Sequence, residues 1–519
     1  MKKNIITLIL LISSSLLMAQ TEFEALKYMQ SDINGTARYM SMAGAFGALG
    51  GDASAIKDNP AGLGIYRKSE IIGTMNILKQ NSTTNWKYND GGNLMNSYGY
   101  DDLYKLGANN FSMVIASPTW RNESGTEGML SSNFSFSYNR LKNFDRNFYA
   151  NSGPSVSSMT DYIANFSEGF NPIDLQYNSS INELFNNNNI PTSSIYGYQG
   201  FLMDSVANEK WGSAISNNIM PTYSLSEQGH LDEYSIGWAG NFSNKFYFGA
   251  TLNYQALNYT AFGTYSETFG SEGNMIIGDT IYTKGNALNL KIGTIFAPTD
   301  FLRLGLSIHT PTIFKLSDNY YSTLDYNRTG LDAGKIVAPG NNNAYQLQSP
   351  LKVDASVAFI VGTKGLISAE YIYSNNTGTR LLSDEGDNTP FRDENQGMSK
   401  VLNNSRTIKI GGEYRLSENF SLRAGYANTN NETKPTAEKY LQLNTVKVNP
   451  EYFLHNSTNY LTAGFGYHES GWFIDFAYMN KIIDETFYPY RSVDVANVLV
   501  PANVITANNN MVVTLGFKF

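Results

Sequence analysis

Hydrophobic and polar residues alternate along short segments throughout the chain, and the last ten residues give the clearest example. One face of an extended strand would carry Met511, Val513, Leu515, Phe517 and Phe519, and the other Asn510, Thr514, Gly516 and Lys518, interrupted by Val512. Because successive side chains of a strand point to opposite faces, this pattern predicts a β-strand with one apolar face. Its length is that of a strand tilted across a lipid bilayer.

The same alternation defines fourteen segments. They are Ser69–Gln80, Asn110–Pro118, Ser131–Phe144, Tyr234–Phe242, Tyr247–Tyr259, Ala287–Ala297, Phe301–His309, Lys352–Val361, Gly365–Asn375, Thr407–Arg415, Ser421–Thr429, Thr458–Tyr467, Gly471–Ile483 and Asn510–Phe519. An even number of antiparallel strands can close into a transmembrane barrel with both ends on one side. A water-soluble sandwich would show the same alternation with its apolar face turned inward, so alternation alone leaves both folds open.

The connections between these segments alternate between short and long. Tight turns are expected at Ser243–Lys245, Pro298–Asp300, Gly362–Lys364, Ser417–Asn419 and Glu469-Ser470, and long links at Thr260–Asn286, Thr310–Leu351, Asn376–Arg406, Asn430–Ser457 and Asp484–Asn509. Short periplasmic turns and long outer loops are the asymmetry of outer-membrane barrels. The longest link, Asp145–Glu233, contains a predicted helix at Val156–Phe166 and apolar residues at Ile195–Met203. We expect it to fold over the barrel mouth as a first landing site for an apolar ligand.

The first nineteen residues have the pattern of an export signal. Lys2 and Lys3 form a basic start, Ile5–Leu17 is an apolar run, and cleavage is expected after Ala19. No later stretch has the ~18 consecutive apolar residues of a membrane-spanning helix. An exported chain of alternating strands is typical of the outer membrane of a Gram-negative cell. The chain also ends on Phe519, which resembles the terminal aromatic residue read by the barrel assembly machinery.

A stretch rich in small and apolar residues, Gly35–Leu63, lies between this signal and the first predicted strand. It is too short and too rich in glycine to span a bilayer as a helix, and it lacks the alternation of a strand. We therefore expect a compact plug of short helical turns. Pro60 biases Asn59 away from the helical region, so a helix is expected to end there.

The residues of this plug resemble the N-terminal hatch of the FadL family of outer-membrane transporters. The matching residues are Met42, Gly44-Ala45-Phe46, Asp52-Ala53-Ser54-Ala55 and Asn59-Pro60-Ala61-Gly62-Leu63. The resemblance implies a fourteen-stranded all-β barrel, with a small, mostly helical hatch inside, that carries long-chain fatty acids or other hydrophobic compounds. The hatch residues assigned to gating are Asn59, Pro60, Ala61 and Gly62. The expected parts are a signal at 1–19, a hatch at 20–68 and a barrel at 69–519.

In that family, the ligand leaves the lumen sideways through a gap made by a kink in the third strand. Here the third segment, Ser131–Phe144, contains neither glycine nor proline, and no kink can be read from it. The lateral route is therefore an expectation that rests on the resemblance alone.

The composition narrows the function further. The net charge is −8, and −10 without Lys2 and Lys3, which argues against a nucleic-acid partner. The 35 tyrosines and 29 phenylalanines, at only 16% charged residues, suit the aromatic girdles of a membrane barrel. The absence of cysteine excludes disulfides and thiolate chemistry. No HExxH, CxxC, GxSxG or phosphate-loop pattern is present, so we expect neither a catalysed reaction nor a cofactor.

Charged residues are predicted on the lumen face of the barrel. The basic ones are Lys291, Arg303, Lys409, Arg415 and Arg423, and the acidic ones are Asp354, Glu370, Glu413 and Asp475. One interpretation is a wall network of compensating charges. In the other, basic groups hold the carboxylate of an amphipathic ligand, with Arg303 and Arg423 as first candidates and Lys409 beside them. His309 also projects inward, as a hydrogen-bonded wall residue or as a haem ligand, although no metal-ligand spacing accompanies it.

These observations predict an outer-membrane channel for passive uptake of long-chain fatty acids or other hydrophobic small molecules, with ligand release gated by the hatch. Its expected partners are that ligand, outer-membrane lipids and the barrel assembly machinery. The first alternative is a scaffold or shuttle subunit of a protein secretion or uptake complex. A general porin and a haem receptor are further alternatives, and a plug argues against the porin because it would block free diffusion.

Overall fold

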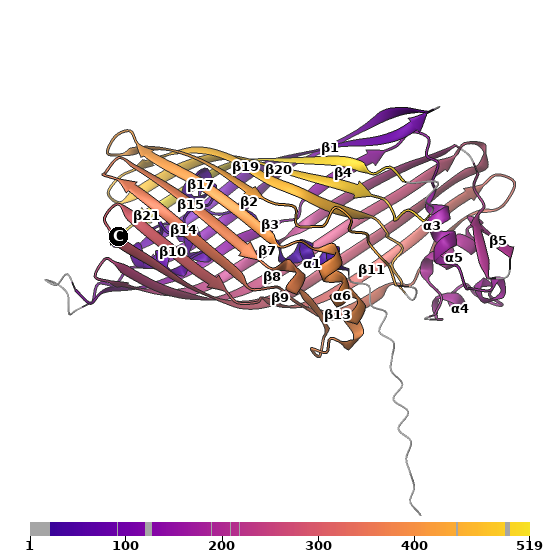
Figure 1. Ribbon diagram of the computed structural model, residues 1–519, viewed down its shortest axis with the longest axis horizontal. Coiled ribbons are helices and arrows are strands. Elements are labelled where there is room, and N and C mark those ends of the chain that lie inside the picture. Colours follow the sequence, from indigo (N-terminus) through magenta and orange to yellow (C-terminus); the bar gives the residue numbers. More distant parts are fainter. Residues whose placement is uncertain are drawn as a thin grey trace, which may run out of the picture.

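The computed structural model describes residues 21–90, 92–119, 127–187, 189–207, 209–216, 218–442, 445–493 and 499–519. Its strands wrap into one long barrel with short helices inside it and at one end (Figure 1). The expected signal at residues 1–19 lies outside the described residues.

Fourteen strands among the described residues form the barrel wall. They are β1 (Glu70–Asp90), β2 (Asn93–Ile115), β3 (Met129–Asn143), β7 (Ile219–Phe242), β8 (Phe246–Phe269), β9 (Gly273–Thr299), β10 (Leu302–His309), β14 (Lys352–Val361), β15 (Gly365–Ser374), β17 (Ser405–Arg415), β18 (Phe420–Thr429), β19 (Tyr452–His468), β20 (Trp472–Tyr488) and β21 (Ala502–Lys518). Each pairs antiparallel with the next, and β21 pairs with β1 to close the barrel. The predicted fold is confirmed, and each predicted segment overlaps one of these strands.

Five wall strands are much longer than a bilayer crossing requires. β1, β2, β7, β8 and β9 contain 21, 23, 24, 24 and 27 residues, about twice the 9–11 residues that cross a membrane. The prediction of an outer loop at Thr260–Asn286 is therefore wrong. Strands β8 and β9 continue through this range and are joined by a short turn, η5 (Gly270–Glu272).

The prediction failed because the polarity of the two strand faces reverses along the length of these strands. In the part of β8 nearer the outer loops, which we call the upper part, Tyr259 and Tyr265 are buried inside the barrel, while Thr264 faces outward. Lower on the same strand, Leu252 is exposed on the outside and Asn253 is buried inside. Apolar side chains thus point inward where the surroundings are water, and outward where they are lipid. A search for an apolar outer face therefore detects only the lower part of each long strand.

The link predicted at Asp145–Glu233 forms a cap at the end of the barrel opposite the C-terminus (Figure 1). It contains β4 (Arg146–Asn151), α3 (Met159–Phe166), η4 (Pro172–Leu175), α4 (Asn182–Phe185), α5 (Thr192–Gln199), β5 (Met203–Ala207) and β6 (Lys210–Ser213). The predicted helix begins after Ser158, whose hydroxyl accepts a hydrogen bond from the Thr160 amide at 3.0 Å. Tyr162 and Ile163 of α3 belong to the same buried cluster as Tyr265 of β8.

The other outer segments add short strands and helices to the same end. They are β11 (Ile313–Arg328), β12 (Ala333–Val337), β13 (Asn341–Gln348), η6 (Asn376–Gly378), β16 (Arg380–Ser383), η7 (Thr389–Phe391) and α6 (Arg392–Val401). β11 pairs with β9 on one side and with β13 on the other, so the wall continues above the short strand β10.

The N-terminal segment lies inside the barrel as a series of short helical turns (Figure 1). They are α1 (Glu22–Met29), α2 (Ala37–Ser41), η1 (Ala53–Lys57) and η2 (Pro60–Ile65). α2 packs against β18–β21, and η2 packs against β3 and β7–β9 on the other side of the lumen. Gly50 has a φ of +59°, and a Cβ placed there would lie 2.6 Å from the Cα of Gly62, so two turns of this hatch cross in direct contact.

The lower part of the barrel carries an apolar outer surface. Large apolar side chains exposed there include Met75, Phe111, Leu252, Leu290, Leu304, Ile367, Ile410, Leu422, Phe465 and Leu515. Exposed aromatic residues, among them Tyr254, Tyr371, Tyr426 and Tyr478, lie on the same outer face. This is the surface of a barrel whose lower part is surrounded by lipid.

None of the described helices is long and apolar enough to cross a membrane.

A charge placed in the middle of this belt tests its position. Leu515 is 48% exposed and stands midway in the outward row from Met511 to Phe519. Leu515→Arg is expected to destabilise the barrel by about 2–4 kcal/mol, because the cation would be desolvated by lipid. Urea unfolding in lipid vesicles measures the change. Thr264→Arg, on the outward face of upper β8, is the matched control and should be neutral. Equal effects of the two substitutions would contradict this position of the belt.

Candidate functional site: the hatch and the lumen cavity

A cavity of about 350 Å³ lies between the hatch and the cap. Its apolar wall includes Tyr28, Leu141, Phe144, Leu225, Tyr259, Ile281, Phe314 and Phe453. Its floor, where the hatch begins, is polar and includes Tyr39, Lys57, Asp58, Lys291, His309, Lys352 and Lys409. Charged side chains, among them Glu24, Arg146, Glu227 and Glu451, also line the cavity, so it offers both apolar and charged surface to an amphipathic molecule.

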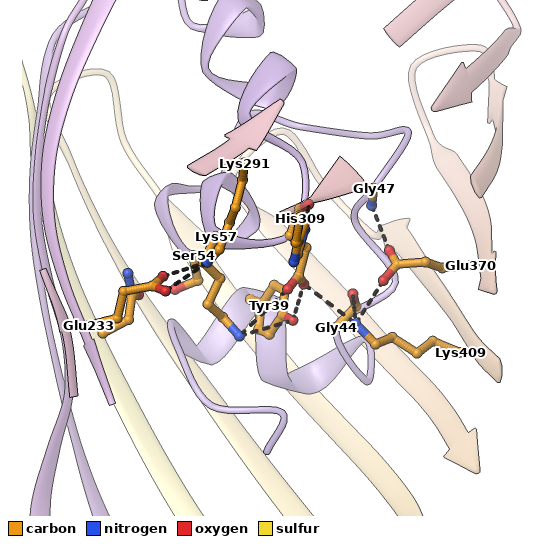
Figure 2. Close-up of polar contacts among 12 residues, drawn as sticks. Tyr39, Gly44, Gly47, Ser54, Lys57, Glu233, Lys291, His309, Glu370 and Lys409 are labelled. Atoms are coloured by element: carbon orange, nitrogen blue, oxygen red, sulfur yellow. Dashed lines mark hydrogen bonds and ion pairs between the residues drawn. The ribbon is translucent and has the colours of Figure 1, made fainter. Parts of the chain in front are cut away.

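The hatch is fixed to the barrel wall by a buried polar network (Figure 2). Lys409 of β17 donates to Glu370 of β15 at 2.7 Å, and the Asp58 carboxylate of the hatch lies 3.4 Å from the same ammonium. The second oxygen of Glu370 accepts the Gly47 amide at 2.8 Å. The Tyr39 hydroxyl donates to Asp58. The Lys409–Glu370 pair of the wall therefore holds the hatch at two places, Gly47 and Asp58.

Charge pairing determines the ionisation of the hatch groups. Burial alone would raise the pKa of Asp58, but the ammonium groups of Lys409 and Lys57 outweigh it and hold that pKa below its usual range. Burial lowers the pKa of Lys57, whose ammonium lies 3.3 Å from the Tyr39 hydroxyl. Asp58 is therefore an anion at neutral pH, and its attachment to the wall is electrostatic.

The motif predicted to gate the channel occupies the contact between the hatch and the wall. Asn59 caps η2 by accepting the Ala61 amide at 3.1 Å, and it donates to the carbonyls of Gly47 at 2.7 Å and Thr294 at 3.1 Å. A Cβ at Gly249 of β8 would collide with the Pro60 carbonyl. The single side chain of Asn59 thus joins both halves of the hatch to β9.

His309 is a hatch contact rather than an isolated wall residue. Its Nε2 lies 2.7 Å from the carbonyl oxygen of Asp58, which also accepts the Ser307 hydroxyl at 2.7 Å. A carbonyl oxygen only accepts hydrogen bonds, so Nε2 carries the hydrogen. Two residues of β10 therefore hold the hatch backbone at the point where η1 ends.

The two arginines chosen as first ligand candidates do not line the cavity. Arg303 donates to the Leu49 carbonyl of the hatch at 2.8 Å. Arg423 lies between Glu413 at 2.6 Å and Asp475 at 2.5 Å. Their surroundings match the interpretation as a wall network of compensating charges. Lys409 does line the cavity, but it is paired as described above.

Lys352 is the cavity cation that sequence reasoning passed over. It lines the floor, and no hydrogen bond or ion pair joins its ammonium group to any described residue. The neighbouring Lys291, by contrast, is paired with Glu233 at 2.7 Å. Lys352 is two residues before Asp354 on the same strand, so both side chains point to the same face. Because Asp354 was predicted to point inward, the same alternation also predicts an inward position for Lys352.

The wall is incomplete between β2 and β3. Their pairing covers only six positions, from Asn110 opposite Asn139 to Ile115 opposite Phe134. Above this point β2 pairs with β1 alone among the described strands. Asn109 is the extra residue of a register shift in β2, and β3 has its own shift between Arg140 and Lys142. The gap therefore arises from irregular pairing and not from a glycine or proline.

A second, smaller cavity of about 40 Å³ lies at this gap. Gly107, Asn109 and Arg140 line it, and it shares Asp32 and Lys481 with the large cavity. The two cavities therefore lie side by side, and the ion pair of 2.5 Å between Lys481 and Asp32 stands where they meet. Lys105 and Asp145 form an ion pair of 3.5 Å between β2 and the residues after β3.

The role of Asn59 in seating the hatch can be tested by conductance. Asn59→Ala removes three hydrogen bonds, one of which caps η2, each worth about 1 kcal/mol. The hatch should loosen while the barrel keeps its melting temperature, and the ion conductance in planar bilayers should rise. Asn503→Ala, an exposed position on upper β21, is the control. An unchanged conductance would show that Asn59 is not needed to seal the lumen.

Comparison with known proteins confirms the fold. No protein-family model and no curated protein sequence matches this chain. A FadL homologue of Pseudomonas aeruginosa is 12% identical and aligns over 94% of this chain and 99% of its own, with a TM-score of 0.52. The toluene transporter TodX of Pseudomonas putida is 11% identical over 95% of this chain and 100% of its own, with a TM-score of 0.50. This chain has the fold of the FadL-type outer-membrane barrels that its hatch residues resemble.

Proposed function

We propose that this protein is a passive outer-membrane channel for hydrophobic or amphipathic small molecules, with long-chain fatty acids as its principal ligands. The observation that carries the proposal is the lumen cavity, which is lined by both apolar and charged side chains and has the β2–β3 gap beside it. The two solved structures named above, a FadL homologue and a toluene transporter, share the barrel fold of this chain and support the same class of function.

The ligand enters through the cap. The helices of the outer link pack over the barrel end and contribute Tyr162, Ile163 and Leu202 to the apolar cluster that continues into the lumen. An apolar chain that leaves water at this point gains roughly 0.8 kcal/mol per buried CH₂. The cap residues therefore serve as the landing site from which the ligand reaches the cavity.

The acidic head group settles on the cavity floor. Lys352 is the cation there without an acidic partner among the described residues, so a ligand carboxylate provides the missing charge. Lys409 and Lys291 are already neutralised by Glu370 and Glu233. A single unpaired ammonium binds an anion without competing with the network that holds the hatch.

Release follows a sideways route into the membrane. The hatch fills the lumen below the large cavity, and the smaller cavity beside it lies at the β2–β3 gap. An apolar ligand that takes this path avoids crossing bulk water. Movement of the hatch about the contacts of Asn59 and Asp58 widens the route and gates it. Outer-membrane lipids then receive the ligand, and Phe519 at the chain end engages the barrel assembly machinery during insertion.

The proposed transport is tested by uptake. Cells that express the protein should take up radiolabelled oleate faster than cells with the empty vector, because the cavity admits the acyl chain. Liposomes containing the protein should not swell in small sugars, because the hatch closes the lumen. Sugar permeation would favour a general porin instead. Absence of oleate uptake together with a stoichiometric co-purifying protein would favour a scaffold or shuttle subunit.

The lateral route is tested by narrowing the gap. Gly107 lines the small cavity, so Gly107→Phe is expected to slow oleate uptake severalfold while oleate binding in detergent stays unchanged. Gly73→Phe is the matched control, because a Cβ at Gly73 has no atom within 4 Å and the side chain would point into lipid. Equal uptake by the two variants would remove the β2–β3 gap from the pathway.

A further inference from the structure

We infer that the cavity floor selects ligands whose acidic head carries a neutral hydrogen-bond donor beside it, as in a hydroxy fatty acid. This inference rests on the proposed function and makes its ligand class more specific. It follows from the juxtaposition of two groups on the floor, His309 of β10 and Lys352 of β14, which are directly opposite each other in the strand pairing. Opposite residues of an antiparallel pair have Cβ atoms about 5 Å apart.

The hydrogen-bonding capacity of His309 is fixed by the hatch. Its Nε2 donates to the Asp58 carbonyl at 2.7 Å, so the neutral ring presents Nδ1 as an acceptor. No described residue donates to Nδ1, and the ring lines the cavity. Nδ1 is therefore an acceptor that a donor on a ligand in the cavity can satisfy.

Lys352 has the complementary requirement. Its ammonium group lines the same cavity and has no acidic partner among the described residues. The other charged groups of the floor are engaged with one another: Lys291 with Glu233, Lys409 with Glu370 and Asp58, and Lys57 with Tyr39. Asp354 also lines the cavity, but both of its carboxylate oxygens are buried. The floor therefore offers one free cation and one free acceptor side by side.

A simple carboxylate satisfies only half of this pair. Both of its oxygens are acceptors, so it binds Lys352 and leaves the lone pair of Nδ1 opposite another lone pair. A hydroxyl on the second or third carbon donates to Nδ1 while the carboxylate stays on Lys352. An ammonium donor fits less well, because Lys352, Lys291 and Lys57 surround the same space. The matching head is thus an acid with an adjacent hydroxyl.

The experiment compares two ligands that differ by one hydroxyl. Binding of palmitate and of 3-hydroxypalmitate to the purified full chain in detergent is measured by calorimetry. The hydroxy acid should bind about fivefold tighter, the value of one added neutral hydrogen bond. His309→Leu should bring the ratio of the two Kd values to about one, whatever change in palmitate affinity follows from the lost contact with the Asp58 carbonyl. Lys352→Met should weaken both ligands by a similar factor and keep their ratio. His230→Leu, a half-exposed histidine outside the cavity, should change neither Kd.

The outcomes separate this inference from the function it rests on. Equal affinity of the two ligands for the unchanged protein overturns the inference and leaves fatty-acid binding intact. The inference is also overturned if His309→Leu keeps the preference, that is, if this substitution lowers the affinities for palmitate and for the hydroxy acid by the same factor. Failure of both ligands to bind the unchanged protein, with oleate uptake also absent, counts against the proposed function itself.

Discussion

The structure depends on the pairing of buried charges inside the barrel. The lumen is filled by a hatch of short turns whose apolar residues, among them Tyr39, Met40 and Phe46, form a buried cluster with residues of the wall. The hatch keeps its place because wall groups such as Lys409, Ser307 and His309 satisfy its carboxylate and backbone oxygens. Removing one partner of a buried ion pair costs about 3–5 kcal/mol, so each contact fixes the hatch strongly.

The fold could be predicted because the membrane imposes one rule on every strand. Apolar side chains such as Leu515 and Leu252 face lipid, and their alternation with polar neighbours fixed the number and order of the wall strands. The rule fails above the lipid, where Tyr259 and Tyr265 turn inward and the outer face is polar. The strands themselves continue, so their upper halves were mistaken for loops. The prediction failed there because the surroundings of the strands change from lipid to water, while the alternation of inward and outward side chains continues along the whole strand.

Only some residues of the candidate site could be predicted from the sequence. The hatch motif at Asn59 was identified from its sequence, and His309 and Lys409 were correctly placed on the lumen face. Arg303 and Arg423 share that face but lie below the cavity, where they contact the hatch and the acidic residues of the wall. The alternation along a strand shows whether a side chain points inward, but it does not show how far along the barrel axis the side chain lies. The β2–β3 gap could not be predicted from the sequence, because a shift of one residue in strand pairing, as at Asn109, does not change the residue types of the segment.

The length of the wall strands determines where the molecule meets its surroundings. Strand β9 has 27 residues, which at ~3.3 Å per residue and a tilt of ~45° corresponds to a height of roughly 60 Å. The hydrocarbon of a bilayer accounts for about half of that. The rest extends the barrel beyond the lipid. Under the proposed function, an oily ligand is therefore captured at a distance from the membrane.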